Sequence, residues 1–71
     1  MVRFGIVRII LLPQNKIVTL SGDLRVSVVL KQLSLLPSTV MVIRNGQLLT
    51  EDELVHDGDE IEIRSVISGG L

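Results

Sequence analysis

The sequence predicts one small α+β domain, in which a mixed β-sheet has a single main helix packed on one face. Two observations favour this fold class. The chain has 71 residues, of which 46% are hydrophobic and 21% are charged, a balance typical of a folded globule rather than a disordered segment. Val and Ile together supply more than half of the apolar residues, and β-branched side chains prefer strands. An all-helical bundle is therefore disfavoured.

The first predicted element is a strand over residues 3–12, which is rich in Ile and Val and is closed by the turn residues Pro13-Gln14-Asn15. Both faces of this strand are apolar, so it is expected to lie centrally or to present its second face to a partner. The even face carries Phe4, Ile6, Ile10 and Leu12, and the odd face carries Val7, Ile9 and Leu11. Residues 16–20 are predicted to return as the second arm of a hairpin.

Residues 24–36 fit either a strand or a helix, because Val26, Val28 and Val29 prefer strands although other apolar positions recur at helical spacing. Length decides for the helix, since a strand of about a dozen residues is unusual. We predict a helix from about Arg25 to Leu35, which Pro37 prevents from continuing. Its buried face is expected to consist of Val26, Val29, Leu30 and Leu33.

The second half of the chain is predicted to form short strands joined by tight turns. Residues 40–44 read as a buried strand, Asn45-Gly46 as a turn and residues 47–49 as a brief strand. Thr50 and Glu53 resemble a capping box, which favours one helical turn through Leu54.

Residues 60–66 are the clearest strand in the chain. Charged and apolar side chains alternate from Glu60 onwards, and this pattern points Ile61 and Ile63 inwards. The predicted domain is therefore 1–67, followed by a flexible tail at 68–71. Parallel pairing of the first and last strands, with the helix across one face, is the β-grasp arrangement known from ubiquitin.

Composition excludes several classes of function. The chain has no Cys, so a disulfide, a thiolate metal site and a catalytic thiol are all excluded. A net charge of -1 gives no electrostatic reason to bind nucleic acid or an anionic membrane. Arg3 and Arg8 interrupt the apolar start that a signal peptide or membrane span needs, so a cytoplasmic protein is expected.

No catalytic or metal site is expected from the side chains. The single His, His56, has no nucleophile or orienting acid in a recognisable pattern and is interpreted as a solvated loop imidazole. The acidic residues between Glu51 and Glu60 lack the spacing of a calcium loop, so they are interpreted as a solvated face. The chain is therefore not expected to be an enzyme.

The remaining chemical candidate is the pair Gly69-Gly70 after the last strand. Glycine has no Cβ, so two adjacent glycines can pass through a channel that is too narrow for side chains. Such a tail can present a carboxylate deep inside the active site of another protein. The tail would then be a substrate rather than a catalyst.

Three stretches of the sequence resemble the ThiS/MoaD family of ubiquitin-like sulfur carriers. They are residues 42–46 (Val-Ile-Arg-Asn-Gly), residues 54–63 (Leu-Val-His-Asp-Gly-Asp-Glu-Ile-Glu-Ile) and residues 66–70 (Val-Ile-Ser-Gly-Gly). Molybdopterin-type members often carry aromatic and proline residues before the final glycines, and residues 63–67 lack them. The chain is more similar to the thiamine and tRNA-thiolation carriers.

The resemblance implies a function for Gly69 and Gly70. An adenylating, ubiquitin-activating-like enzyme would use ATP to activate the carboxylate of Gly70, and a sulfur donor would convert it to a thiocarboxylate. A synthase or transferase would then pass the sulfur to a thiazole precursor, a tRNA base or a pterin. The carrier itself would hold no tightly bound cofactor. The expected docking residues are Val7, Ile9, Met41 and Ser68, whereas Ile63 is interpreted as core.

Leu71 departs from the family pattern, because the resemblance implies that the reactive carboxylate belongs to a glycine. The carrier role therefore implies that Leu71 is removed first. Two alternatives remain open. One is a ubiquitin-like modifier, whose activated end forms an isopeptide bond with a lysine, and the other is a non-catalytic β-grasp binding module.

Overall fold

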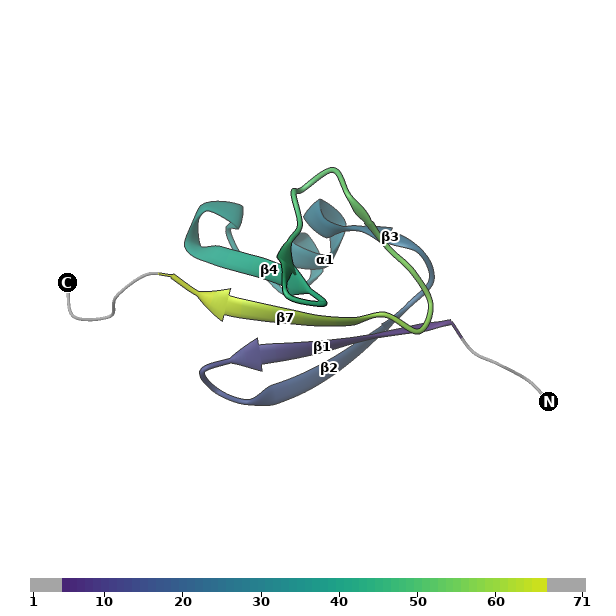
Figure 1. The fold of residues 1–71 in the computed structure, drawn as a ribbon, viewed down its shortest axis with the longest axis horizontal. Helices are drawn as coiled ribbons and strands as arrows, with labels where there is room; N and C mark the ends of the chain where they lie inside the picture. Colours follow the sequence, from purple (N-terminus) through teal and green to yellow (C-terminus); the bar gives the residue numbers. More distant parts are fainter. Residues whose placement is uncertain (1–4, 67–71) are drawn as a thin grey trace.

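The computed structural model describes residues 5–66, which form a five-stranded mixed sheet with one helix across it (Figure 1). The strand order is β2-β1-β7-β4-β5, and β3 (Leu24–Arg25) pairs with β6 (Leu54–Val55) in a separate two-stranded sheet. The main sheet consists of β1 (Ile6–Leu12), β2 (Lys16–Ser21), β4 (Val40–Arg44), β5 (Gln47–Leu48) and β7 (Glu60–Ser65). The predicted α+β class and the β-grasp arrangement are confirmed.

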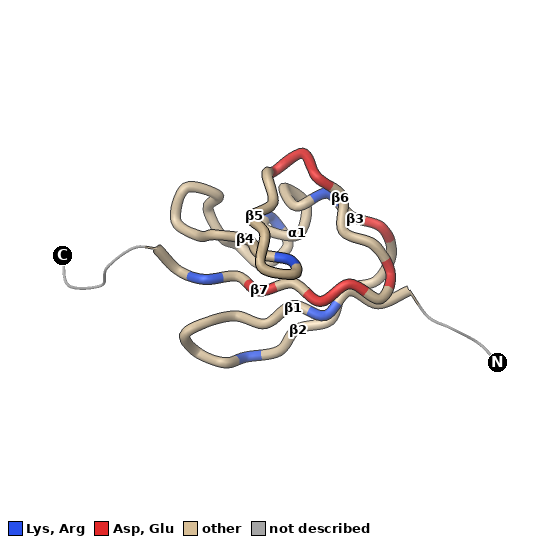
Figure 2. Tube along the Cα trace, viewed as in Figure 1, with Lys and Arg blue, Asp and Glu red and all other residues tan. Residues whose placement is uncertain are grey.

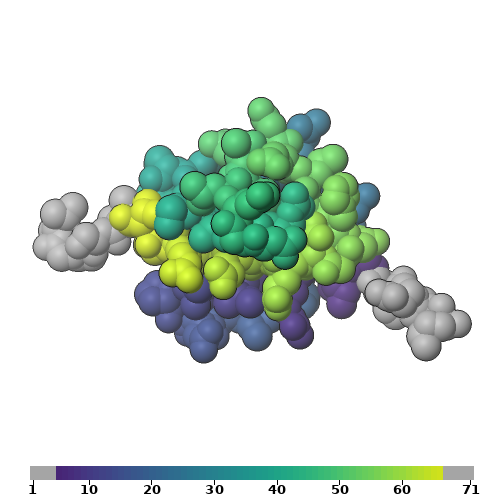
Figure 3. All heavy atoms as spheres, in the orientation of Figure 1, coloured from purple at the N-terminus to yellow at the C-terminus, as the bar shows by residue number. Residues whose placement is uncertain are grey.

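The central pairing is the parallel one between β1 and β7. Arg8 lies opposite Glu60 and Leu12 opposite Arg64, while β4 pairs antiparallel with the other edge of β7. β2 pairs antiparallel with β1, so the predicted hairpin is also confirmed. β7, drawn in yellow, lies between the purple hairpin and the teal segment of β4 (Figure 3). The last strand is therefore held on both sides.

The helix is shorter than the sequence predicts: α1 covers Val26–Gln32 instead of about 25–35. It starts later because Leu24–Arg25 form strand β3, which pairs with β6 (Leu54–Val55). No side chain caps its first turn, where backbone carbonyls accept instead: Val26 N–H donates to Glu53 at 2.9 Å and Ser27 N–H to Glu51 at 3.1 Å. The loop before β6 therefore fixes where the helix begins.

The C-terminal end of α1 is closed by the backbone. Ser34 has a positive φ of 59°, and the N–H of Leu35 returns to the carbonyl oxygen of Leu30 at 2.9 Å. Leu33 is half-buried and packs against the core, and a 3₁₀ turn at Pro37–Thr39 leads into β4. Of the four residues predicted for the buried face, three are fully buried and Leu33 is at the margin.

The core lies between α1 and the inner face of the sheet. Its members are all aliphatic, and each is at most 5% exposed. They are Val7, Ile9, Val26, Val29, Leu30, Val42, Val55, Ile61 and Ile63. The prediction that Ile61 and Ile63 point inwards is confirmed, and Ile63 is core as interpreted.

The segment around Thr50 forms a turn without becoming a helix. The N–H of Thr50 donates to Oε2 of Glu53 at 2.9 Å, as the capping-box pattern predicts. Leu54 belongs to β6 rather than to the predicted helical turn, because β3 offers it a strand partner. In the part of the chain that the structure describes, no helix is long and apolar enough to cross a membrane.

Candidate functional site

The predicted reactive residues, Gly69 and Gly70, lie outside the described residues, as do Ser68 and the predicted tail at 68–71. The structure does describe the strand that leads to them. β7 ends at Ser65, and the next N–H, that of Val66, donates to the carbonyl oxygen of Thr39 at 3.0 Å. β1 and β4 thus fix the position and direction from which the chain leaves the sheet (Figure 1).

The prediction that Val7 and Ile9 form a docking surface is wrong. Both side chains are 0% exposed and belong to the core. The register explains this, because Ile9 lies opposite Ile61 of β7 and therefore shares its inward face. Arg8 carried the missed signal: a charged residue on the even face of the strand marks that face as the solvated one.

The outer face of the sheet, opposite α1, is the surface that remains apolar and accessible. Met41 is 37% exposed and lies on this face, as a docking role requires. Four large side chains there are exposed, led by Leu48 at 64% and Ile17 at 59%, and the remaining apolar ones are half-buried. By the strand register, the apolar residues of the outer face are Ile6, Ile10, Leu12, Ile17, Met41, Ile43 and Leu48.

Two exposed ion pairs cross the middle of the outer face. Nη1 of Arg8 lies 3.3 Å from Oε2 of Glu60, and Nε of Arg64 lies 3.6 Å from Oε1 of Glu62. A hollow of about 390 Å³ lies beside them, lined by Ile10, Ile43, Asn45, Gly46, Glu60 and Glu62. The face thus offers apolar contact area with charged groups that can orient a protein partner.

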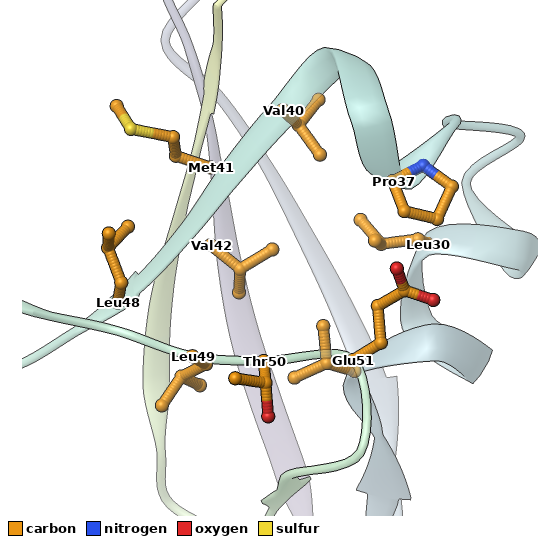
Figure 4. Close-up of a pocket in the computed structure, with 10 residues that line it drawn as sticks. Leu30, Pro37, Val40, Met41, Val42, Leu48, Leu49, Thr50 and Glu51 are labelled. Carbon is orange, nitrogen blue, oxygen red and sulfur yellow. The ribbon is translucent and has the colours of Figure 1, made fainter.

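A second hollow of about 400 Å³ lies near the helix, between α1, the 3₁₀ turn and β4 (Figure 4). Val40 and Val42 point into it together with Leu30, whereas Met41 and Leu48 point to the other side of β4. Glu51, at its rim, is the only charged residue in the lining. The described residues that line this hollow include no nucleophile–base pair.

No catalytic constellation forms among residues 5–66. Nδ1 of His56 lies 3.5 Å from Oδ1 of Asp23 on the surface, as expected for a solvated imidazole. Six of the eight acidic residues lie in connecting loops, and the other two, Glu60 and Glu62, lie on β7 (Figure 2). Across these residues no group of three His, Asp or Glu side chains is placed to hold a metal ion.

The shortest ion pair among residues 5–66 joins β4 to the loop before β7. Nη1 of Arg44 donates to Oδ2 of Asp59 at 2.9 Å and to the carbonyl oxygen of Leu54 at 3.0 Å. Burial acts to raise the pKa of Asp59, but hydrogen bonds from His56 N–H and Arg44, with the charge of Arg44, leave that pKa below its ordinary value of 3.8. The ionised carboxylate therefore stabilises the fold.

We expect the contact between Arg44 and Asp59 to make stability depend on pH. Arg44→Met should lower the free energy of unfolding by about 1–2 kcal/mol at pH 7. Because the pKa of Asp59 is lower in the folded than in the unfolded state, its contribution is present above about pH 4 and is lost as pH falls through the folded-state pKa. Urea unfolding at pH 7 and at pH 3 measures both effects.

Arg8→Met is the matched control, because it removes an ion pair whose side chains are 59% and 56% exposed. That change should cost less than about 0.5 kcal/mol at either pH. An Arg44→Met penalty of the same size at pH 3 and pH 7 would contradict the assignment to Asp59.

Comparison with known proteins matches the chain to a protein family and to a relative of known name. The model of the ThiS family matches residues 4–70. The sulfur carrier protein TtuB of Thermus thermophilus is 41% identical over 59 residues, which cover 83% of this chain and 91% of TtuB. The family match spans every strand of the sheet, the helix and the outer face described above.

Proposed function

Because the chain belongs to the ThiS family, we propose that it is a sulfur carrier protein whose reactive group is the carboxylate of Gly70. The observation that carries the proposal is the extent of the family match, which runs from the first strand to Gly70 and includes Gly69. The fold supports it, since β7 leads directly towards these glycines from the centre of the sheet.

The proposed chemistry begins with activation of a carboxylate, which is a poor electrophile. An oxygen of the Gly70 carboxylate attacks the α-phosphorus of ATP and releases pyrophosphate, which leaves an acyl-adenylate. Hydrosulfide released by the donor then attacks the acyl carbon through its sulfur, and AMP leaves with the bonding electrons of the cleaved acyl C–O bond. The product is a thiocarboxylate that an acceptor enzyme can use as a sulfur source.

The partners supply the catalysis. The adenylating enzyme binds and consumes ATP, so the carrier needs no cofactor of its own. Its described residues offer a docking surface and a fixed strand but no acid–base or nucleophilic group in a catalytic arrangement. The chain is a carrier and not an enzyme.

The proposed sulfur acceptor is a thiazole precursor or a tRNA base. A pterin is the less favoured alternative. Residues 63–67 carry no aromatic or proline residue, which resembles the thiamine and tRNA-thiolation carriers. In the structure Ile63 belongs to the core, whereas Arg64, which lies on the outer face, and Ser65 are exposed. With Val66, which is also exposed, they are the last described residues before the reactive end.

The mass of the native protein tests the proposal. A thiocarboxylate adds the mass difference between one sulfur and one oxygen to a chain that ends at Gly70. Recovery of this form from cells supports the carrier function. Conjugates of high mass that depend on Gly70, without any thiocarboxylate form, would contradict it and favour the protein modifier.

We expect the outer face to dock the adenylating enzyme. Leu48→Glu should weaken binding of that enzyme at least about tenfold, because it places a charge at the most exposed apolar position of the face. Isothermal titration calorimetry with the purified enzyme measures the change in Kd.

Leu36→Glu is the matched control. Leu36 is 67% exposed, similar to Leu48, but lies between α1 and the 3₁₀ turn on the helix side of the sheet. Its substitution should change Kd less than about twofold. Equal losses in the two variants, or no loss in either, would show that the enzyme docks elsewhere.

A further inference from the structure

The two edges of the main sheet differ in length. β5 contains only two residues, whereas β2, at the opposite edge, contains six. An exposed strand edge presents unpaired N–H and C=O groups that can pair with another strand. β2 is therefore the edge with capacity for further pairing.

The register with β1 shows which groups of β2 point outwards. The N–H of Gly22 donates to the carbonyl oxygen of Gly5 at 3.0 Å, so Gly22 and Gly5 form a hydrogen-bonded pair. Such pairs alternate along an antiparallel ladder, so the backbone groups of residues 16, 18 and 20 also face β1. The N–H and C=O groups of Ile17, Thr19 and Ser21 therefore point away from β1, towards the open edge of the sheet.

The common protections of a strand edge are lacking at β2. Six consecutive residues keep one register with β1, so no bulge interrupts the strand, and it contains no Pro. Its only charged residue, Lys16, is at its first position. Ile17, Thr19 and Ser21 are all exposed, with Ile17 at 59%, and across residues 5–66 no other segment covers them.

We propose that β2 pairs antiparallel with β2 of a second copy of this chain, about a twofold axis that passes beside Thr19. In this register Ile17 lies opposite Ser21 of the other copy, and Thr19 lies opposite Thr19. The three outward-facing residues of each strand then form three pairs, and each pair exchanges two hydrogen bonds. The sheets of the two copies become one continuous sheet.

Side chains and charges are compatible with this register. Thr–Thr pairs are favourable across antiparallel strands, and no like charges lie opposite one another. Lys16 at the start of one strand lies opposite Gly22 of the other copy, next to Asp23, so the cationic end of each β2 meets the anionic end of its partner. The two Lys16 side chains lie at opposite ends of the interface.

The dimer is compatible with the carrier role but does not depend on it. β1 separates β2 from β7, so the strand that leads to Gly70 stays outside the new interface. The outer faces of the two copies lie on the same side of the joined sheet, because the twofold axis is perpendicular to it. A failure of the dimer would therefore leave the sulfur-carrier proposal unaffected.

Sedimentation equilibrium over a concentration series tests the dimer. The unmodified chain should show a monomer–dimer equilibrium. Thr19→Pro removes an outward N–H at an edge position where Pro is tolerated, and it should weaken dimerisation at least about tenfold. Thr19→Lys places like charges opposite each other at the axis and should weaken it similarly, which keeps the test valid if the Pro variant fails to fold.

Thr19→Val is the matched control, because it keeps the backbone N–H and a β-branched side chain, and its dimerisation should be unchanged or tighter. Amide hydrogen exchange gives a second readout. The N–H groups of Ile17, Thr19 and Ser21 should become protected as concentration rises. A chain that stays monomeric at every concentration, or a Thr19→Lys variant that dimerises like the original, would overturn the proposal.

Discussion

A chain that ends at Gly70 is expected to support ATP–pyrophosphate exchange by its adenylating enzyme at least about a hundredfold faster than a chain that retains Leu71. The carboxylate must reach the α-phosphate within bonding distance, and misplacement of about 1 Å can cost a hundredfold in rate. A branched side chain at the end of a channel shaped for glycine clashes with its walls and holds the carboxylate back.

Two further chains separate the channel argument from a requirement for length alone. Gly69→Ala in a chain that ends at Gly70 keeps the length but adds a Cβ and restricts φ and ψ, so exchange should fall. A chain that ends at Gly69 is too short for its carboxylate to reach the α-phosphate of ATP, so exchange should fall as well. Equal exchange for the Gly70-ended, Leu71-ended and Gly69→Ala chains would contradict the channel argument, and no exchange from any of them would favour the binding-module interpretation.

The strands and turns with strong local signals could be predicted from the sequence. Charged and apolar residues alternate through Glu60 and Ile61, which places β7 correctly, and β7 ends within one residue of its predicted end. Asn45 and Gly46 both have positive φ, 54° and 79°, as a tight turn with this sequence requires. These features depend on neighbouring residues alone, so the sequence is sufficient to specify them.

The short strands β3 and β6 could not be predicted in the same way. Each has two residues, and each is a strand only because the other lies beside it, although the paired residues Arg25 and Leu54 are 29 positions apart in the sequence. The same contact moved the start of the helix from the predicted Arg25 to Val26, since Arg25 pairs with β6. The helix also ends earlier than predicted, at Gln32, because the backbone at Ser34 closes it. For the short strands and the start of the helix, a contact between residues far apart in the sequence overrode the local preference for helix or strand.

The candidate site was predicted in part. Met41 lies on the exposed outer face, but Val7 and Ile9 lie in the core, because both faces of β1 are apolar and periodicity alone does not show which one α1 covers. Only the register with β7 decides between them. Ile43 and Leu48 were missed because their side chains join the outer face through the pairing of β4 with β5.

Leu30→Ala is expected to lower the free energy of unfolding by about 2–5 kcal/mol, a large share of the stability of so small a domain. Leu30 is 2% exposed, and it packs in the core formed by α1 and the inner face of the sheet. Its removal leaves a cavity that the aliphatic neighbours on β4 and β7 can fill only partly. Urea unfolding followed by circular dichroism measures the loss.

Val28→Ala is the matched control, because Val28 lies on the same helix but is 36% exposed. Alanine has a higher helix propensity than valine, so this change should alter stability by less than about 0.5 kcal/mol in either direction. A difference of at least about 2 kcal/mol between the two variants would establish that α1 contributes through its buried face rather than through helix propensity. Equal effects would show that the helix is packed against the sheet by a different face from the one described.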